Sequence, residues 1–187
     1  MNITSITDRL FLIKDFLTQD LLNQLSTIEW ATISADQQEP SGQLHRRKMP
    51  FNSHSIMTTF DHYVWDNLKT IESATGVEFD GKRPVTAWWY DEPGYVCPIH
   101  TDGHLVSSMQ LYWYGATEDY GTVFYNSKNP DDTLYKFKFI SNSGYLMLNQ
   151  LNEDGSQPLQ WHGALNIVPV GMYRLSSYTY LHTYKTK

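Results

Sequence analysis

The feature that most constrains the fold of this chain is a change in pattern near residue 84. From there on, short β-rich runs alternate with turn segments rich in Gly, Asn, Asp and Pro, and no long helical pattern returns. Eight short strands at this spacing predict a double-sheet jelly roll, or double-stranded β-helix. The expected strands lie near residues 85–90, 96–101, 106–114, 121–126, 134–140, 144–149, 160–168 and 172–181.

The N-terminal part has a different pattern. Residues 10–16 (LFLIKDF) predict a short strand, and apolar residues at helical spacing predict amphipathic helices over about 18–29 and 59–74. Thr18 is a suitable N-cap for the first helix, and Gly76 suits the position directly after the second. Both helices should cover one face of the sheet structure. The expected fold class is therefore mainly β with N-terminal helices.

The length of 187 residues suits one domain with a substantial core. We expect a single domain over 1–187, with a helical support region at 1–80 and the jelly-roll core at 84–182. No internal repeat or linker divides it. The number of copies in the functional assembly is left open.

Charge and cysteine content restrict partners and compartment. Fourteen basic against twenty acidic residues give a net charge of −6, which argues against a nucleic-acid partner held by bulk charge. Cys97 is the one cysteine, so no disulfide forms within the chain and a reducing compartment is expected. The start of the sequence lacks the pattern of a signal peptide, and no apolar run has membrane-spanning length. A cytoplasmic location without membrane contact is the resulting expectation.

The strongest candidate for chemistry is the segment 90–102, YDEPGYVCPIHTD. In a strand, residues two apart project to the same face, so the imidazole of His100 and the carboxylate of Asp102 should share one space. They would supply two ligands of a 2-His-1-carboxylate site, which leaves positions open on a non-haem Fe(II) ion. A distant histidine must complete the set, and His162 in LQWHGALNIV is the candidate.

Each of these residues also has an ordinary interpretation. A single strand histidine is more often a partly buried core residue, and Asp102-Gly103 is a common turn pair. His104 competes with His100 as a ligand because it lies two residues beyond Asp102.

A candidate anion site follows twelve residues after His162, in GMYRLSSYTYL. Strand alternation places Arg174, Ser176 and Tyr178 on one face. The guanidinium fork of Arg174 can grip a carboxylate bidentately, with the Ser176 hydroxyl as a second donor. The alternative is a surface arginine that is paired or extends its charge into solvent.

The order H-x-D, then His162-Gly163 at a strand start, then R-x-S on the next strand is more specific than any one part. Over roughly 85–181 it resembles the Fe(II)/2-oxoglutarate-dependent dioxygenases, nearest to the prolyl 4-hydroxylase-like branch. Further matching positions are Gly94, Gly121 and Gly144. The chain lacks a long substrate-binding extension.

The resemblance implies a cofactor and a reaction. Fe(II) would be held by His100, Asp102 and His162, and 2-oxoglutarate by Arg174 and Ser176 with O₂ as the oxidant. It also implies hydroxyl donors toward 2-oxoglutarate at two tyrosines, Tyr90 and Tyr112. The implied reaction hydroxylates a substrate C–H bond and releases succinate and CO₂.

The substrate is not specified by the sequence. An aromatic wall can form from Trp89 and Trp113, although alternation lets only some neighbouring aromatics face inward. The basic cluster His45–Lys48, with Arg46 and Arg47 at its centre, is either a solvated loop or a clamp for an anionic group. A peptide such as a prolyl peptide and a small molecule both remain open as substrates.

Two other function classes compete with the hydroxylase. A cupin-like jelly roll could bind a metal or a sugar without redox chemistry, as a binding protein or an isomerase. A buried cation at Arg174 would separate the two, because a non-oxygenase jelly roll has no need of one. A nucleobase demethylase on the same fold is disfavoured by the negative charge and by the lack of a basic, aromatic lid.

Overall fold

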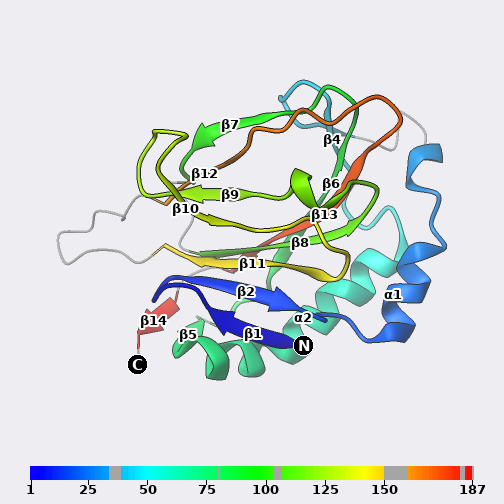
Figure 1. Ribbon diagram of the computed structural model, residues 1–187. Helices are drawn as coiled ribbons and strands as arrows, with labels where there is room; N and C mark the ends of the chain where they lie inside the picture. Colours follow the sequence, from blue (N-terminus) through cyan, green and yellow to red (C-terminus); the bar gives the residue numbers. More distant parts are fainter. Residues whose placement is uncertain (34–38, 80, 103–106, 150–159, 182–183, 187) are drawn as a thin grey trace.

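The computed structural model describes residues 1–33, 39–79, 81–102, 107–149, 160–181 and 184–186. A large sheet and a smaller sheet pack face to face, and two helices lie against the outer face of the large sheet (Figure 1). This arrangement confirms the predicted mainly β jelly roll with N-terminal helices.

The large sheet is antiparallel throughout. Its strands, in spatial order, are β1 (Asn2–Ser5), β2 (Leu10–Lys14), β11 (Ser143–Leu148), β8 (Ser107–Tyr114), β13 (Arg174–Leu181), β6 (Val85–Asp91), β4 (Arg46–Lys48) and β3 (Glu39–Pro40).

The remaining elements are shorter. The small sheet has the order β10 (Thr133–Lys136), β9 (Val123–Tyr125), β12 (Trp161–Ala164) and β7 (Cys97–His100), and a separate pair joins β14 (Tyr184–Thr186) to β5 (Val77–Phe79). The helices are α1 (Gln19–Ser26) and α2 (Ser55–Thr75), with short 3-10 turns at Trp30–Thr32 and Glu118–Tyr120. None of the described helices is long and apolar enough to span a membrane.

The helices begin and end where local chemistry indicates. The Thr18 side chain accepts a hydrogen bond from the backbone N–H of Leu21 at the start of α1, which satisfies one free donor of the first turn. Gly76 has a φ of 76° at the end of α2, a left-handed conformation that glycine adopts without a Cβ penalty. The α2 helix starts at Ser55, four residues before the expected position.

The expected strands are all present, but the N-terminal region contributes more than helices. Its strands β1 and β2 form one edge of the large sheet, and β3 and β4 form the other. Between the two helices, where the sequence predicts no strand, lies β4, whose residue Arg46 is opposite Asp91 of β6. The first expected residue of β8, Val106, lies outside the described residues.

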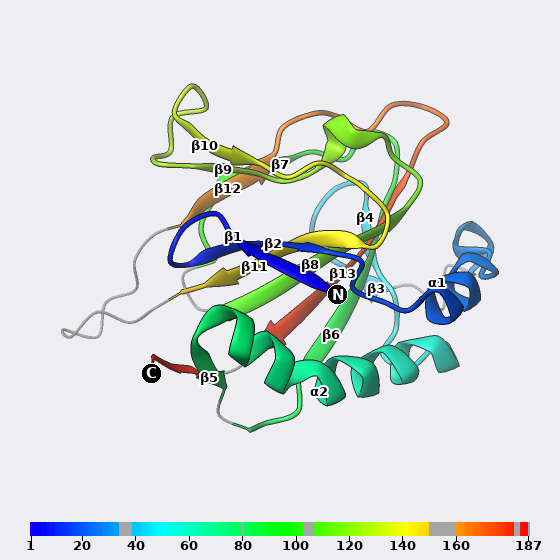
Figure 2. The same cartoon turned by 60° about the horizontal axis from the view of Figure 1, so that its bottom comes forward.

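Two hydrophobic clusters hold these layers together. The larger one lies between the large sheet and the helices (Figure 2), where Phe60 of α2 packs against Trp88 of β6 and Trp113 of β8. The smaller one lies between the two sheets and contains Tyr112, Tyr145 and Phe124, among others. The large sheet is therefore covered on both faces, which requires apolar residues at odd and even strand positions.

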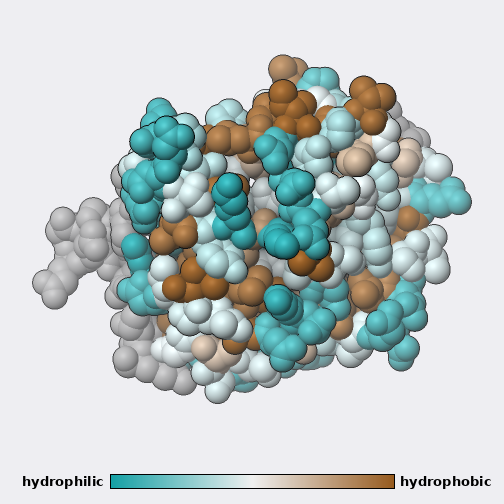
Figure 3. All heavy atoms as spheres, in the orientation of Figure 1, coloured by the Kyte–Doolittle hydropathy of each residue, from teal (hydrophilic) through white to brown (hydrophobic). Residues whose placement is uncertain are grey.

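An apolar surface gathers along the upper edge of the molecule in Figure 3, where the β6–β7 and β12–β13 connections run in Figure 1. We call this surface the apolar rim. We define it by five exposed apolar side chains on the connections of this region, namely Leu44 between β3 and β4, Val96 between β6 and β7, and Leu165, Ile167 and Val170 between β12 and β13. Backbone hydrogen bonds join the two connections, from Gly94 N to Val168 O at 2.7 Å and from Val168 N to Tyr95 O at 3.0 Å.

Candidate active site

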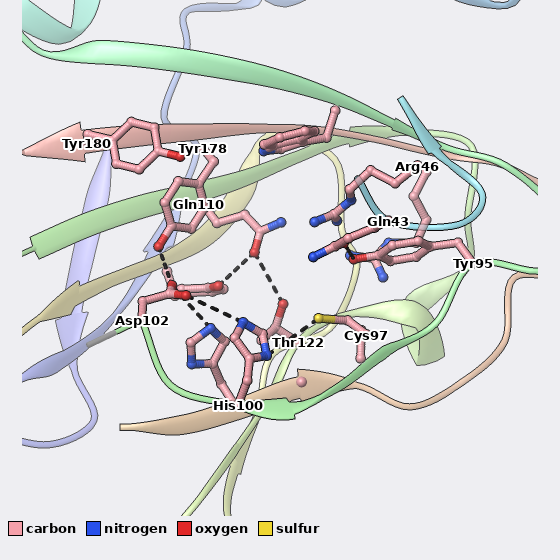
Figure 4. A pocket seen from close by; sticks show the side chains of 16 residues that line it. Gln43, Arg46, Tyr95, Cys97, His100, Asp102, Gln110, Thr122, Tyr178 and Tyr180 are labelled. Carbon is pink, nitrogen blue, oxygen red and sulfur yellow. Dashed lines mark hydrogen bonds and ion pairs between the residues drawn. The ribbon is translucent and has the colours of Figure 1, made fainter. Parts of the chain in front are cut away.

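Two histidines and an aspartate converge between the two sheets (Figure 4). His100 ends β7, and the antiparallel pairing of β7 with β12 sets His162 directly opposite it, with ring centroids 4.4 Å apart. Asp102 follows two residues after His100 and turns toward the same space. One ligand atom from each of the three lies within 4.8 Å of the others. The structure therefore brings together the three residues predicted as metal ligands.

Backbone carbonyls fix the orientation of both rings. Nδ1 of His100 lies 2.8 Å from the carbonyl oxygen of Pro98, and Nδ1 of His162 lies 3.0 Å from that of Gln160. Because a carbonyl oxygen can only accept, each Nδ1 carries a proton and each Nε2 faces the carboxylate. Nε2 of each ring is 3.4 Å from an oxygen of Asp102.

The protonation of these groups reflects their mutual contacts. The hydrogen bond with Asp102, and then that with Cys97, raises the pKa of His100 to about 10. Burial alone would raise the pKa of Asp102, but hydrogen bonds from His100, His162 and Tyr178 hold that pKa well below its usual range. The site is thus an anionic carboxylate that faces Nε2 of two imidazoles, an arrangement that can bind a divalent cation.

This donor set fits Fe(II). Two imidazole nitrogens and one carboxylate are the facial triad that non-haem Fe(II) takes in oxygenases. Within the described ranges, it is the one group of three His, Cys, Asp or Glu side chains close enough to share a cation. His104, the competing ligand, lies outside the described residues.

A cavity of about 180 Å³ extends from the triad to Arg46 and Arg174. This volume lies below the roughly 300–1,000 Å³ of pockets for drug-sized ligands, so the enclosed space suits a small molecule. Its walls combine aromatic rings, including Trp89 and Tyr95, with hydrogen-bonding side chains (Figure 4).

Of the two arginines that line this cavity, Arg174 is the more deeply buried. Its side chain is 1% exposed, and its Nε lies 3.6 Å from Oδ2 of Asp91, beyond hydrogen-bonding distance. Among the described residues, neither Nε nor Nη1 has a hydrogen-bond partner. Leaving charged donors buried and unpaired is costly. The carboxylate end of a small ligand such as 2-oxoglutarate would satisfy them, so Arg174 fits the role predicted for it.

Asp91 has a second and closer partner. Arg46 donates to both its carboxylate oxygens, from Nε at 2.6 Å and from Nη2 at 3.1 Å. The guanidinium of Arg46 also lies over the rings of Tyr95, at 4.3 Å, and of Trp89, at 5.1 Å. Although burial opposes its charge, Asp91 and Tyr95 keep the pKa of Arg46 above its usual value.

Polar side chains on the large sheet form the floor of the cavity. Oε1 of Gln110 accepts a hydrogen bond from the Tyr145 hydroxyl at 2.7 Å and lies 3.4 Å from the Thr122 hydroxyl. Nε2 of Gln110 lies 3.4 Å from Oγ of Ser176. The predicted donor Ser176 is therefore buried beside the cavity, where it contacts the lining residue Gln110. The other predicted donor, Tyr112, is also buried, and its hydroxyl accepts a hydrogen bond from the Thr122 N–H at 2.9 Å.

Three predicted site residues lie elsewhere, and these expectations are corrected. Strand alternation turns Trp89 toward the cavity and Tyr90 to the helical side, where Tyr90 stacks on Tyr173 at 5.0 Å. Trp113 points to the same helical side and is fully buried in the larger cluster. The same alternation directs Arg47 away from the cavity, and Arg47 pairs with Glu92 at the surface.

Two residues of the site were not predicted from the sequence. Gln110, which lines the cavity, and Asp91, which pairs with the lining residue Arg46, lie two residues along a strand from Tyr112 and Trp89, respectively, and so share their faces. Alternation from the residues already chosen was the signal that could have found them. Asp91 and Gln110 are polar residues in strands that are largely buried, which supports this signal.

Comparison with known proteins supports the fold. No family model and no curated protein matches the sequence. Among solved structures, the chain is similar to a prolyl-4-hydroxylase from Pseudomonas putida, with a TM-score of 0.61, 14% identity, and coverage of 93% of this chain and 92% of that one.

Two further structures contain 2-oxoglutarate. One is T7H from Neurospora crassa in complex with alpha-KG, with a TM-score of 0.63, 10% identity, and coverage of 95% of this chain and 75% of that one. The other is HygX from Streptomyces hygroscopicus with nickel and 2-oxoglutarate, with a TM-score of 0.60, 10% identity, and coverage of 93% and 83%. The chain thus has the fold of 2-oxoglutarate-dependent oxygenases and a His-Asp-His triad in it.

Proposed function

We propose that this chain is an Fe(II)- and 2-oxoglutarate-dependent dioxygenase that hydroxylates a C–H bond of its substrate. The observation that carries the proposal is a triad of metal-ligand type and an unpaired buried arginine in one cavity. A metal-binding jelly roll without redox chemistry has no need of that arginine. Similarity to structures that hold 2-oxoglutarate adds support.

The chain's own residues would divide the work between two ends of the cavity. His100, Asp102 and His162 would hold Fe(II), and Arg174 would bind the distal carboxylate of 2-oxoglutarate through its free donors. When bound, the iron and 2-oxoglutarate would supply the oxidative chemistry, in which 2-oxoglutarate, O₂ and the substrate C–H group are converted to succinate, CO₂ and the hydroxylated product. The aromatic walls would exclude water from this reaction.

The remaining lining residues would serve binding and orientation. Gln110, held by Tyr145 and Thr122, presents its amide N–H₂ group on the cavity floor near Ser176. Tyr178 would hold Asp102 in place through its hydroxyl. Because groups that are already positioned need not reorganise during the reaction, these contacts would raise the reaction rate of the bound complex.

The substrate would enter beside the apolar rim. Three of its members, Leu44, Val96 and Leu165, are each next in the sequence to a residue that lines the cavity. The cavity is small, so a substrate would place only its reacting end inside and rest its apolar part on the rim. A peptide and a small molecule both satisfy this description. The single cysteine supports the further proposal of a reducing, cytoplasmic compartment.

Anaerobic titration with Fe(II) and 2-oxoglutarate tests the proposal. The chelate should give a weak visible metal-to-ligand absorption band, and His100→Ala or Asp102→Ala should abolish it. Arg174→Ala should raise the 2-oxoglutarate concentration required, since truncating one partner of a buried charged pair costs roughly 2–5 kcal/mol. Aerobic release of succinate then serves to screen substrates.

Two outcomes would contradict the proposal in different ways. Metal binding without the band would favour a metal-binding jelly roll with no 2-oxoglutarate chemistry. Absence of metal binding would show that the triad does not act as a metal site. Arg47→Gln is a matched control for Arg174→Ala, because Arg47 lies at the surface in an ion pair with Glu92.

A further inference from the structure

We infer that Arg46 is a charge-balancing residue, which holds Asp91 so that Arg174 stays free to bind the distal carboxylate of the co-substrate. This inference rests on the proposed function, and it assigns a role in the site to the strand β4. It also explains why a buried carboxylate can stand next to an anion site without blocking it.

The distances show which arginine Asp91 prefers. Arg46 binds both oxygens of the carboxylate, at 2.6 and 3.1 Å, which is the strong bidentate arrangement. Arg174 reaches Asp91 with one nitrogen at 3.6 Å, too far for a hydrogen bond. Asp91 is therefore committed to Arg46, and Nε and Nη1 of Arg174, which have no hydrogen-bond partner among the described residues, remain free for a ligand.

The charges of the cluster lead to the same conclusion. Asp91 and Arg174 are buried, with side chains 0% and 1% exposed, and Arg46 is mostly covered, with its side chain 12% exposed. Two guanidinium groups against one carboxylate leave one net positive charge. A single carboxylate from a ligand would neutralise it, which suits one end of a dicarboxylate.

Without Arg46, the charge balance around Asp91 would change. Asp91 would be left buried with Arg174 as its nearest cation in the cluster, and burial makes an unpaired carboxylate costly. A small movement would then close the 3.6 Å gap and form an internal pair of Asp91 with Arg174. That pair is neutral and would compete directly with the ligand.

The backbone register fixes this arrangement in place. Asp91 at the end of β6 pairs with Arg174 of β13 on one side and with Arg46 of β4 on the other. The two arginines thus flank the carboxylate across three adjacent strands. Cation–π contacts with Tyr95 and Trp89 further stabilise the Arg46 guanidinium beside Asp91.

The test compares two ligands on protein loaded with Ni(II), which binds such triads without turnover. Calorimetry would measure the Kd of 2-oxoglutarate and that of 2-oxovalerate, which has the same chain length but no distal carboxylate. Arg46→Gln should raise the Kd of 2-oxoglutarate by roughly 30-fold or more, as expected when a buried charge pair is truncated. The Kd of 2-oxovalerate should stay unchanged, whereas a general loss of structure would weaken both ligands.

The double variant Arg46→Gln with Asp91→Asn provides the decisive comparison. It removes the competing carboxylate together with its partner, so 2-oxoglutarate binding should return to within a few-fold of the unaltered protein. A double variant that binds more weakly than Arg46→Gln would overturn the inference, as would an Arg46→Gln variant that binds 2-oxoglutarate normally. Arg47→Gln, one residue away on the same strand, should change neither Kd.

Two further results keep the inference separate from the proposed function. If the unaltered protein binds 2-oxoglutarate no better than 2-oxovalerate, the distal-carboxylate site itself is wrong, and both proposals fall. If Arg46→Gln does not fold, Arg46→Lys replaces it, because lysine keeps the charge but cannot bind both oxygens. Arg46→Lys should then give an intermediate loss confined to 2-oxoglutarate, and an equal loss for both ligands would refute the inference.

Discussion

The hydroxyl of Tyr178 donates a hydrogen bond to Oδ2 of Asp102 at 2.6 Å. The same hydroxyl oxygen of Tyr178 lies 2.7 Å from Oγ of Ser108. Because a phenol has a single proton, the Ser108 hydroxyl must donate to Tyr178 in return. Two neighbouring strands of the large sheet thereby hold the carboxylate that lies between the histidines. This contact connects the rigid sheet to the candidate metal site.

Removal of the Tyr178 hydroxyl should therefore weaken metal binding. We expect Tyr178→Phe to lower the affinity for Fe(II) or Co(II) about 10-fold, the lower end of the range found when a residue that orients a metal ligand is changed. Anaerobic titration measures the affinity. Tyr180→Phe is the control, since Tyr180 packs against Tyr178 at 5.2 Å on the same strand. Equal affinities for Tyr178→Phe and the unaltered protein would exclude the positioning role.

Metal removal should leave the fold intact. The two hydrophobic clusters contain neither His100 nor Asp102 and are complete without a cation. We expect a chelator to lower the melting temperature only by the mass-action stabilisation that a bound ligand provides. Circular dichroism in the near and far ultraviolet measures this directly. A collapse of the near-ultraviolet signal on chelation would show that the metal is structural, as it is in zinc fingers.

Much of this fold and site was predictable, because the signals are local. The strands of the jelly roll follow from short apolar runs between turn residues, and the His100–Asp102 pair follows from the two-residue repeat of a strand. His162 required a guess about long-range pairing, which the register of β12 with β7 confirms. The order of the H-x-D sequence, His162-Gly163 and the R-x-S sequence made that guess possible.

The remaining features depend on information that no local pattern carries. The run VTAWWYD is apolar at both odd and even positions because β6 is covered on both faces, so alternation alone does not show whether Trp89 or Tyr90 faces the cavity. The same holds for Tyr112 and Trp113. The strand β4 consists of three basic residues, and its place in the sheet depends on the ion pair with Asp91, which is distant in sequence.

Gly144 shows how close the strands approach behind the cavity floor. A Cβ at this position would overlap the carbonyl oxygen of Gln110 and lie 2.8 Å from the Cα of Leu111. Gly144→Ala would therefore push β11 away from β8, and we expect a loss of at least about 3 kcal/mol of unfolding free energy. Urea denaturation measures the loss.

The control for Gly144→Ala is Gly42→Ala. Gly42 has a φ of +76°, and a Cβ added there would have nothing within 4 Å, so alanine meets only backbone strain at this position. That strain costs about 1–2 kcal/mol. A smaller effect at Gly144 than at Gly42 would contradict the steric argument.

Asp61 on α2 should make stability depend on pH in a predictable direction. Burial raises the pKa of Asp61 above its ordinary 3.8, outweighing the opposite effects of Thr86 and Arg83, and its Oδ1 has no hydrogen-bond partner among the described residues. A pKa raised by folding means that the native state binds the proton more tightly than the unfolded state. Stability is then lost as the pH rises from 3.8 through the raised pKa.

Asp61→Asn removes this loss and should stabilise the protein at neutral pH. We expect a gain of less than about 1 kcal/mol, because solvent screens a partly exposed carboxylate. The gain should shrink as the pH falls toward 3.8 and below, where the Asp61 carboxyl becomes protonated in the unfolded state as well as in the folded state. Melting temperatures across pH 4–8 measure it, with Asp66→Asn at an exposed position of the same helix as the control. A gain that grows toward acid pH would reverse the sign and exclude burial as the cause.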